Sequence, residues 1–415
     1  MESARLIAGL ARYTGDIGLA EELAQDAVLA ALEQWPESGV PRNAGAWLMT
    51  VAKRRAIDQF RRNRELQHKY AQIGRALEAE GDSVTPDFDR AFSDDIDDDL
   101  LRLVFTACHP VLAVQARVAL TLRVLGGLST AEIARAYLVP EPTVAQRIVR
   151  AKKTLARAQV PFEVPGAAER PARLSSVLEV IYLIFNEGYS ATAGDDWMRP
   201  ALCEDALRLG RILAQLTPAE PEVHGLVALL EIQASRVRAR TGPSGEPVLL
   251  LDQDRGRWDR LLINRGLAAL ARAEELGGAR GPYALQAAIA ACHARALRPE
   301  DTDWRRITEL YAVLAEVLPS PVIELNRAVA VSMAFGAQAG LDLVDALVAE
   351  PALRGYHLLP SVRGDLLMKL GRPDEARAEF ERAARLTRNE PERELSAERA
   401  RAAEAEAAGR ASAPG

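Results

Sequence analysis

The sequence is poor in the residues that mark secreted and membrane-spanning proteins. Its 415 residues include only three cysteines, Cys108, Cys203 and Cys292. This odd and scattered set suits a reducing compartment better than a disulfide framework. No stretch approaches the roughly 20 apolar residues that span a bilayer. The first residues have neither the apolar run nor the cleavage site of a signal peptide. We therefore expect a soluble, cytoplasmic protein that does not enter a membrane.

Aromatic residues are also scarce, at 5% of the chain, and almost no stretch has the alternating pattern of a strand. Apolar residues instead recur at spacings of three and four, and the strong helix formers Ala and Leu are abundant. These features predict an all-α fold. The length is enough for two to four domains.

Motifs of catalysis and metal binding are missing too. There is no glycine-rich phosphate loop, no zinc-protease motif and no nucleophile elbow. Cys108 beside His109 lacks a second pair at zinc-ligand spacing, and the run DDIDDD lacks the glycine turn of a calcium loop. The other histidines lie far apart and have no paired acids nearby in the sequence: His68, His224, His293 and His357. We expect no enzyme, no cofactor and no metal.

Charge is distributed in blocks along the first 160 residues. The formal net charge of −6 argues against indiscriminate coating of nucleic acid. Two basic clusters nevertheless flank an acidic segment that reaches from Glu78 to Asp99. The first cluster comprises Lys53, Arg54, Arg55, Arg61, Arg62 and Arg64, and the second Arg147, Arg150, Lys152, Lys153 and Arg157.

The second basic cluster lies in a predicted pair of short helices. Ser129 followed by Glu132 is a capping box, which predicts a helix from Thr130 to about Tyr137. Pro140 and Pro142 end that helix and begin the next. In the second helix an apolar stripe of Val144, Ile148 and Leu155 faces the first helix. The opposite face carries Thr143, Gln146, Arg147, Arg150, Lys153 and Arg157.

This pair matches the helix-turn-helix arrangement, in which the second helix enters the major groove. Its outer face combines side chains that read base edges with cations that hold phosphates. The alternative interpretation is an ordinary amphipathic hairpin with a solvated basic face.

Two earlier helical stretches carry further candidates. In residues 43–64 Trp47 shares a face with Arg54 and Arg61, which suits stacking of unpaired bases beside backbone-binding cations. The alternative for a lone tryptophan is the core. In residues 16–35 an acidic face of Glu22, Gln25, Asp26 and Glu33 is suited to a basic partner helix, or is simply solvated.

Three runs in this order resemble regions 2 and 4 of extracytoplasmic-function sigma factors of the sigma-70 family: GLAEELAQDAVLAAL, AWLMTVAKRRAIDQFRR and LSTAEIARAYLVPEPTVAQRIVRAKKTLA. The resemblance implies core RNA polymerase and promoter DNA as partners, with contacts to the β′ clamp and the β flap. The polymerase-binding residues would be Glu22, Gln25 and Asp26. Recognition of the −10 element would fall to Trp47, Lys53, Arg54, Arg55, Arg61 and Arg62. Thr143, Gln146, Arg147, Arg150 and Lys153 would enter the −35 major groove.

The second half of the chain reads as stacked helical hairpins. Segments beginning near Gly281, Pro321 and His357 each hold two amphipathic helices at a repeat-like spacing. The last resembles a tetratricopeptide repeat through Gly364, Leu367, Gly371, Ala376, Phe380 and Ala383. A regulatory protein is a possible partner of such repeats. The charged run DQDRGRWDR at 252–260 is either a ligand site or a structural ion-pair network.

These patterns predict five segments: region 2 at 1–70, an acidic linker at 71–99, region 4 at 100–161, a tetratricopeptide-like extension at 162–397 and a disordered tail at 398–415. The expected function is transcription initiation with repeats that modulate it. The alternatives are a stand-alone helix-turn-helix regulator and a repeat scaffold.

Overall fold

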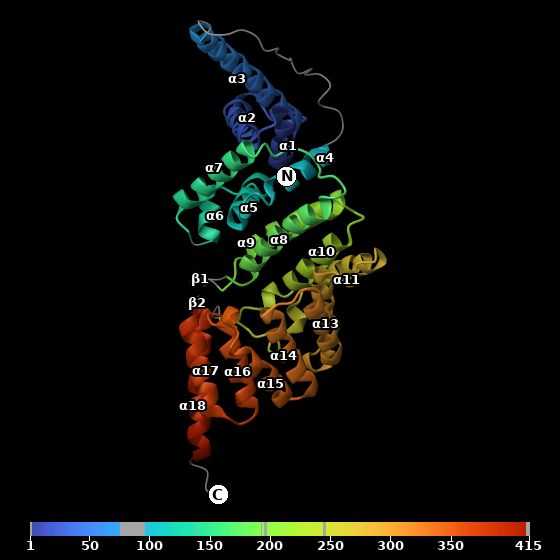
Figure 1. The fold of residues 1–415 in the computed structure, drawn as a ribbon, viewed down its shortest axis with the longest axis vertical. Helices are drawn as coiled ribbons and strands as arrows, with labels where there is room; N and C mark the ends of the chain where they lie inside the picture. Colours follow the sequence, from blue (N-terminus) through green and yellow to red (C-terminus); the bar gives the residue numbers. More distant parts are fainter. Residues whose placement is uncertain are drawn as a thin grey trace. The chain divides into compact units, whose positions relative to one another are not determined.

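The protein is described by a computed structural model for residues 2–74, 96–137, 139–191, 193–194, 197–243 and 246–411. In this part of the chain nearly all regular structure is helical, which confirms the all-α prediction. The exceptions are two-residue strands, β1 (Ala193–Gly194) and β2 (Arg388–Asn389), which pair in parallel, and a single bridge between Thr241 and Pro247. The chain divides into two compact units, Met1–Val180 and Ile181–Gly415 (Figure 1). Among the described helices, none combines the length and the apolar character of a membrane span.

The first unit begins with three helices, α1 (Glu2–Thr14), α2 (Ile17–Ser38) and α3 (Ala44–Gly74). The side chain of Asp16 accepts hydrogen bonds from the backbone N–H groups of Gly18 and Leu19, which starts α2. The interfaces are lined by alanines that are fully or almost fully buried: Ala8, Ala11, Ala20, Ala24, Ala27, Ala52 and Ala56. Such small side chains let the helices pack closely.

The same unit continues with α4 (Ile96–Ala107), α5 (Val114–Thr121), the π-helical turn η1 (Leu122–Gly126), α6 (Thr130–Ala136) and α7 (Glu141–Arg157). Gly127 ends η1 with a φ of 76°, in the left-handed region that favours glycine. Large side chains such as Phe105, Leu120 and Leu122 are buried here. The unit also includes the start of α8 (Arg170–Tyr189), where Glu179 accepts a 3.0 Å bond from Arg117.

The predicted linker at 71–99 was wrong at both ends. Helix α3 continues to Gly74, and α4 begins at Ile96, while residues 75–95 lie outside the described part. Asp99, the last aspartate of the DDIDDD run, is only 7% exposed. It pairs with Arg102 at 2.6 Å and with Arg12 of α1 at 3.5 Å. Acidic residues suit the first turn of a helix, because they meet its positive dipole end there.

The second unit contains α9 (Pro200–Leu216), α10 (Pro221–Ala234) and α11 (Arg260–Glu275), with short 3-10 turns η2 (Val237–Ala239) and η3 (Arg255–Arg257) between the last two. The DQDRGRWDR loop runs through η3. Asp254 and Asp259 cap the elements that follow them.

Buried Arg255 holds the same loop by donating hydrogen bonds to the carbonyls of His293 and Ala296 and to the hydroxyl of Thr302. These contacts support the structural interpretation of DQDRGRWDR. Caps and hydrogen bonds to carbonyls hold the loop, whereas that interpretation expected ion pairs.

Three helical hairpins follow, as the spacing predicted. They are α12 (Pro282–Arg295) with α13 (Trp304–Val317), α14 (Pro321–Phe335) with α15 (Ala337–Leu347), and α16 (Leu358–Lys369) with α17 (Pro373–Leu386). The turns η4 (Pro299–Asp301) and η5 (Pro351–Leu353) lie in their connections. Gly364 faces the ring of Phe380, and a Cβ at this glycine would meet the ring at 2.6 Å. The small-large pattern thus allows the close approach of α16 and α17.

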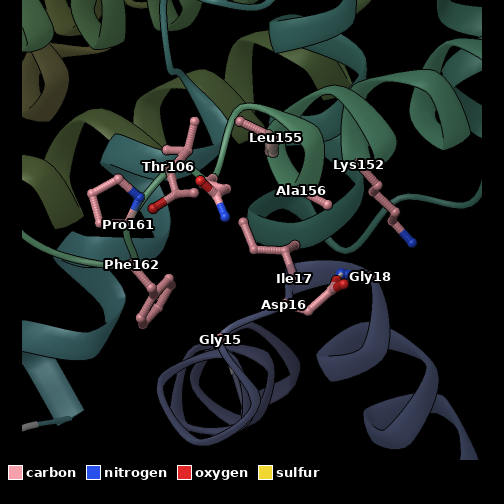
Figure 2. Close-up of a pocket in the computed structure, with 12 residues that line it drawn as sticks. Gly15, Asp16, Ile17, Gly18, Thr106, Lys152, Leu155, Ala156, Pro161 and Phe162 are labelled. Atoms are coloured by element: carbon pink, nitrogen blue, oxygen red, sulfur yellow. Dashed lines mark hydrogen bonds between the residues drawn. The ribbon is translucent and has the colours of Figure 1, made fainter. Parts of the chain in front are cut away.

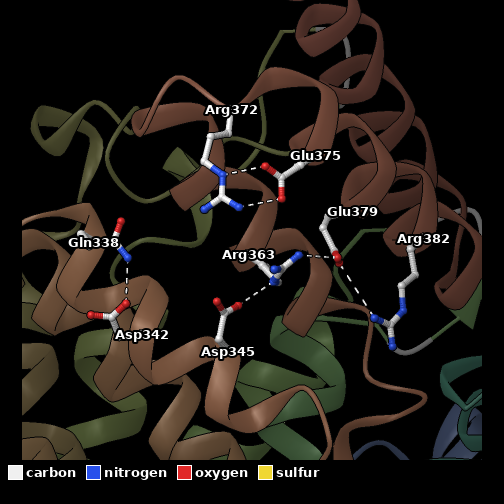
Figure 3. A network of polar contacts seen from close by, with 8 residues as sticks. All are labelled: Gln338, Asp342, Asp345, Arg363, Arg372, Glu375, Glu379 and Arg382. Atoms are coloured by element: carbon white, nitrogen blue, oxygen red, sulfur yellow. Dashed lines mark hydrogen bonds and ion pairs between the residues drawn. The ribbon is translucent and has the colours of Figure 1, made fainter.

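A polar network joins α15, α16 and α17 (Figure 3). Arg363 of α16 lies at its centre, 2.8 Å from Asp345 of α15 and 2.8 Å from Glu379 of α17. Arg372 makes two 2.7 Å bonds to Glu375 beside it. One arginine therefore links three successive helices.

The predicted disordered tail at 398–415 was wrong for its first fourteen residues. Helix α18 (Glu390–Ala411) runs through them, and residues 412–415 lie outside the described part. Ala400 and Ala403 are buried in the same cluster as Leu367, Ala376 and Phe380. Arg377 of α17 also reaches Glu404 at 3.3 Å. Helix α18 therefore packs on the last hairpin.

Candidate nucleic-acid interface

The helix-turn-helix has the geometry that its sequence predicted. Both the backbone N–H and the hydroxyl of Ser129 donate to the Glu132 carboxylate, at 2.8 and 2.7 Å, and the N–H of Glu132 donates to that hydroxyl. This reciprocal pattern is a capping box. Pro140 is the N-cap of α7, and the hydroxyl of Thr130 donates to Glu141 at 2.9 Å. The two helix starts are thus tied together.

The two faces of α7 differ as expected. Val144, Ile148, Ala151 and Leu155 are buried. Of the predicted −35 residues, Gln146, Arg150 and Lys153 are exposed, and Thr143 and Arg147 are half-buried. No ion pair or side-chain hydrogen bond of these five residues is found within the described ranges. Their polar groups are available to an external ligand such as a nucleic acid.

Lys152 has a different role from its neighbours in the basic cluster. Its ammonium lies 2.5 Å from a carboxylate oxygen of Glu21, and Arg123 binds the other oxygen at 2.6 Å. Glu21 belongs to α2 and is only 5% exposed. We name this group the Glu21 clasp: Glu21, Arg123 and Lys152. It joins helices α1–α3 of the first unit to helices α4–α7. No pattern in the sequence predicted this contact.

A cleft of about 470 Å³ opens beside the clasp. Figure 2 shows Gly15 to Gly18, at the start of α2, on one side of it and residues of α7 and the following segment on the other. Lys152, Leu155 and Phe162 are among the lining residues. The wall formed by α7 lies on the side of that helix that carries Lys152.

The predicted −10 residues lie along α3. Trp47 is half-buried, with its ring 5.4 Å from that of Trp35. Arg54 and Arg61 are exposed and Lys53 is half-buried. Arg62 belongs to α3, but its side chain lies outside the described residues. Trp47 is therefore neither wholly in the core nor free in solvent, which falls between the two interpretations of the sequence.

Helix α2 presents the predicted acidic face to solvent, because Glu22, Gln25 and Asp26 are all exposed. Asp26 pairs with Arg55 of α3 at 3.3 Å. The same side of the helix continues into Leu29 and Leu32, which are 56% and 67% exposed. Positions three and four apart lie on one face of a helix. The structure thus adds an apolar end to this face that charge patterning alone missed.

Comparison with known proteins decides the family. Residues 2–65 match the family model of sigma-70 region 2, and residues 102–155 match that of sigma-70 region 4. The ECF RNA polymerase sigma factor SigL of Mycobacterium tuberculosis (strain H37Rv) is 31% identical over 146 residues, which make up 35% of this chain and 76% of SigL. The chain belongs to the extracytoplasmic-function sigma factor family.

Other matches extend into the second half of this sigma factor. An uncharacterised protein of Rhizobium meliloti (strain 1021) is 46% identical over 384 residues, 92% of this chain and 89% of that protein. Residues 173–274 match a family of unknown function, DUF6596. The crystal structure of yeast Tom70 aligns with 95% of this chain and 82% of its own at 11% identity and a TM-score of 0.33. A TM-score this low does not indicate a shared fold.

The two matched regions of this sigma factor contain all of the predicted site residues. Their roles as individual contacts stay predictions, because a family match assigns no contact to a single side chain. The three cysteines are buried and unpaired. The thiol of Cys108 lies 3.3 Å from the hydroxyl of Thr121, and burial raises its pKa to about 11. No group of metal-ligating side chains occurs in the described ranges.

Proposed function

We propose that this sigma factor binds core RNA polymerase, directs it to specific promoters through −10 and −35 elements, and has its activity modulated by the helical hairpins of the second unit. The observation that carries the proposal is the outer face of α7. This helix buries its apolar stripe, and within the described ranges no ion pair or side-chain hydrogen bond engages five polar residues of its other face: Thr143, Gln146, Arg147, Arg150 and Lys153.

On this proposal α7 enters the major groove of the −35 element. Arg147 and Gln146 suit base edges, because guanidinium and amide groups bind guanine and adenine in pairs of hydrogen bonds. The exposed cations Arg150 and Lys153 suit phosphates, which position the helix without reading sequence. Thr143, near the N-terminus of α7, completes the contact.

The proposed polymerase contact is the outer face of α2. Glu22, Gln25 and Asp26 offer carboxylates and an amide to a basic partner, and Leu29 and Leu32 offer apolar area beside them. Neighbouring exposed apolar side chains rimmed by polar residues are typical of protein–protein contacts. We assign this face to the clamp helices of the β′ subunit, and the β flap to region 4, as the family resemblance implies.

The proposed −10 contact is α3. Trp47 offers a ring on which an unpaired base can stack, and exposed Arg54 and Arg61 offer charge to the strand. Lys53, Arg55 and Arg62 belong to the same helix. Arg55 is held by Asp26 of α2, so the proposed polymerase and −10 faces share one exposed ion pair.

The test is run-off transcription with purified core RNA polymerase on a pool of promoter fragments, together with binding of the protein to core. Leu29→Asp and Leu32→Asp should remove core binding and transcription. Both positions are exposed, so we expect the variants to stay folded. Leu261→Asp is the matched control, because Leu261 is 59% exposed on α11 of the other unit.

Protein-dependent transcripts that share upstream sequences, lost in the α2 variants and kept in the control, would support the proposal. Duplex binding without any binding to core would refute it in favour of a stand-alone helix-turn-helix regulator. A variant that ends after residue 180, the last of the first unit, tests the modulating role. Unchanged transcription by that variant would show that the second unit does not modulate transcription.

A further inference from the structure

A pocket of about 290 Å³ lies within the second unit. Its walls come from α8, α10, α12, α13 and α14, so it is built from parts of the chain far apart in sequence. It combines aromatic rings, side-chain amides and one arginine. Its lining includes Tyr182, Tyr189, Gln233, Arg236, His293 and Tyr311.

Arg236 gives the pocket its charge. The residue is only 8% exposed, and its Nε has no hydrogen-bond partner. Its guanidinium lies over the rings of Tyr189 and Trp258, with centroid distances of 5.8 and 5.6 Å. No ion pair of this arginine occurs in the described residues. A buried cation without a counter-charge is costly to the fold, so its retention here needs an explanation.

No carboxylate is among the described residues that line this pocket. Two acidic residues lie close in sequence to lining residues of α10 and α8, and each already has an arginine partner. Glu231 of α10 accepts two hydrogen bonds from Arg211, at 2.7 and 2.9 Å, and Glu187 of α8 pairs with Arg199. Arg211 and Arg199 thus have carboxylate partners, whereas the charge of Arg236 faces the pocket.

The charge state of His293 indicates that the pocket suits a ligand with a single negative charge. Burial, followed by the charges of Arg236 and Arg255, lowers the pKa of His293 to about 3, so this imidazole is neutral at pH 7. Arg236 is then the single cation among the lining residues. A ligand with one negative charge would balance Arg236. A carboxylate suits this arginine, because a guanidinium binds it through two parallel hydrogen bonds.

The rest of the pocket combines ring surface with side-chain amides and an imidazole, which suits a flat ring that carries a polar group. Tyr182, Tyr189 and Tyr311 supply ring surface. The carbonyl oxygen of Gln233 and the Nδ1 of His293 are buried without partners. Within the walls, the hydroxyl of Tyr182 donates to Gln286 at 3.1 Å and Arg255 holds the end of α12. A concave pocket that combines ring surface with a few placed polar groups is typical of small-molecule sites.

We propose that this pocket binds a small aromatic carboxylate, with its carboxylate on Arg236 and its ring among the tyrosines. The site goes beyond the proposed function and does not rest on it, because binding requires neither polymerase nor DNA.

The test is calorimetric titration of the full chain with benzoate and, as a neutral probe of the same shape, benzamide. Benzoate should bind and benzamide should bind at least about tenfold more weakly. Arg236→Gln should weaken benzoate by about 10- to 100-fold, the usual effect of removing a charge-assisted pair. Arg238→Gln is the matched control, because Arg238 is exposed and only two residues away, and it should bind benzoate as the parent does.

A second variant keeps the test decisive if Arg236→Gln fails to fold. Gln233 lies three residues before Arg236 and lines the same pocket. Gln233→Glu places a carboxylate there, which would pair with the arginine from within. It should raise the melting temperature and abolish benzoate binding. Such a result separates the charge of the site from the integrity of the fold.

Several outcomes would overturn the proposal. Equal binding of benzoate and benzamide would show that the charge of the ligand does not contribute to binding. Parent-like benzoate binding by Arg236→Gln or Gln233→Glu would assign Arg236 to packing against Tyr189 and Trp258. Inorganic phosphate that binds where benzoate does not would replace the carboxylate with another anion, and no binding of benzoate to the parent at millimolar concentration would remove the site.

Discussion

Removal of the charge of Glu21 is the sharpest test of how the first unit is held together. Glu21→Gln keeps the shape of the side chain but leaves Arg123 and Lys152 without a carboxylate. Loss of one partner from a buried ion pair costs about 3–5 kcal/mol. Both cations have some compensation, since Arg123 also donates to the carbonyl of Leu128 at 3.1 Å and the Lys152 side chain is 19% exposed. We therefore expect the lower end, about 3 kcal/mol.

Hydrogen exchange followed by mass spectrometry on the full chain can measure this loss locally. A decrease of about 3 kcal/mol in the free energy of opening corresponds to roughly 100-fold faster exchange. The increase should appear in peptides of α2 and α7, which carry the clasp. Peptides of the second unit should exchange at the parent rate and so serve as an internal reference.

Glu22→Gln is the control for the clasp, because Glu22 is the same residue type one position along α2 and is exposed. Exposed substitutions of this kind usually change stability by less than about 0.5 kcal/mol. Equal exchange rates in the Glu21 and Glu22 variants would refute the energetic role of the clasp. A uniform increase across both units would instead indicate global destabilisation.

Three further predictions test other parts of the chain. Burial lowers the pKa of His293 to about 3, against about 6.5 when unfolded, so the unfolded chain binds the extra proton between these values and stability falls as pH falls. The parent should lose about 2 kcal/mol more than His293→Gln between pH 7 and pH 5 in melting experiments, and parallel losses would contradict the assignment. Gly364→Ala should cost about 1–3 kcal/mol through its contact with Phe380, whereas Gly355→Ala, which meets nothing within 4 Å, should be neutral in the same thermal scan. Arg147→Ala should weaken binding to a preferred −35 sequence by about 1–3 kcal/mol in a fluorescence titration, and equal losses on random duplex would make the residue a phosphate contact.

Local features of the fold were predictable because short-range chemistry fixes them. The capping box at Ser129 and the prolines before α7 set helix boundaries within a few residues. The three hairpins followed from spacing, and the contact of Gly364 with Phe380 followed from a small-large pattern. The sequence patterns also distinguished the buried stripe of α7 from its polar face.

Long-range features were not predictable from the same patterns. Glu21 and Glu22 are the same residue type. Glu21 is the buried one because it lies on the inward side of α2 and pairs with Arg123, which is 102 residues away in the sequence. The binding pocket draws residues from five helices, so no local motif marks it. The packing of residues 398–411 on the last hairpin was not predicted, because Ala400 and Ala403 supply the contacts and alanine gives a weak apolar signal beside Glu and Arg.

Helix α18 has a consequence for how the protein behaves in concentrated solution. A stack of hairpins has an open end, where apolar side chains such as Leu367 and Phe380 would meet the same surface on another molecule. Alanines of α18 cover that end, and its outward residues are largely Glu and Arg. Helix α18 thus closes the stack with a charged surface, and a variant without this helix would tend to join end to end into aggregates.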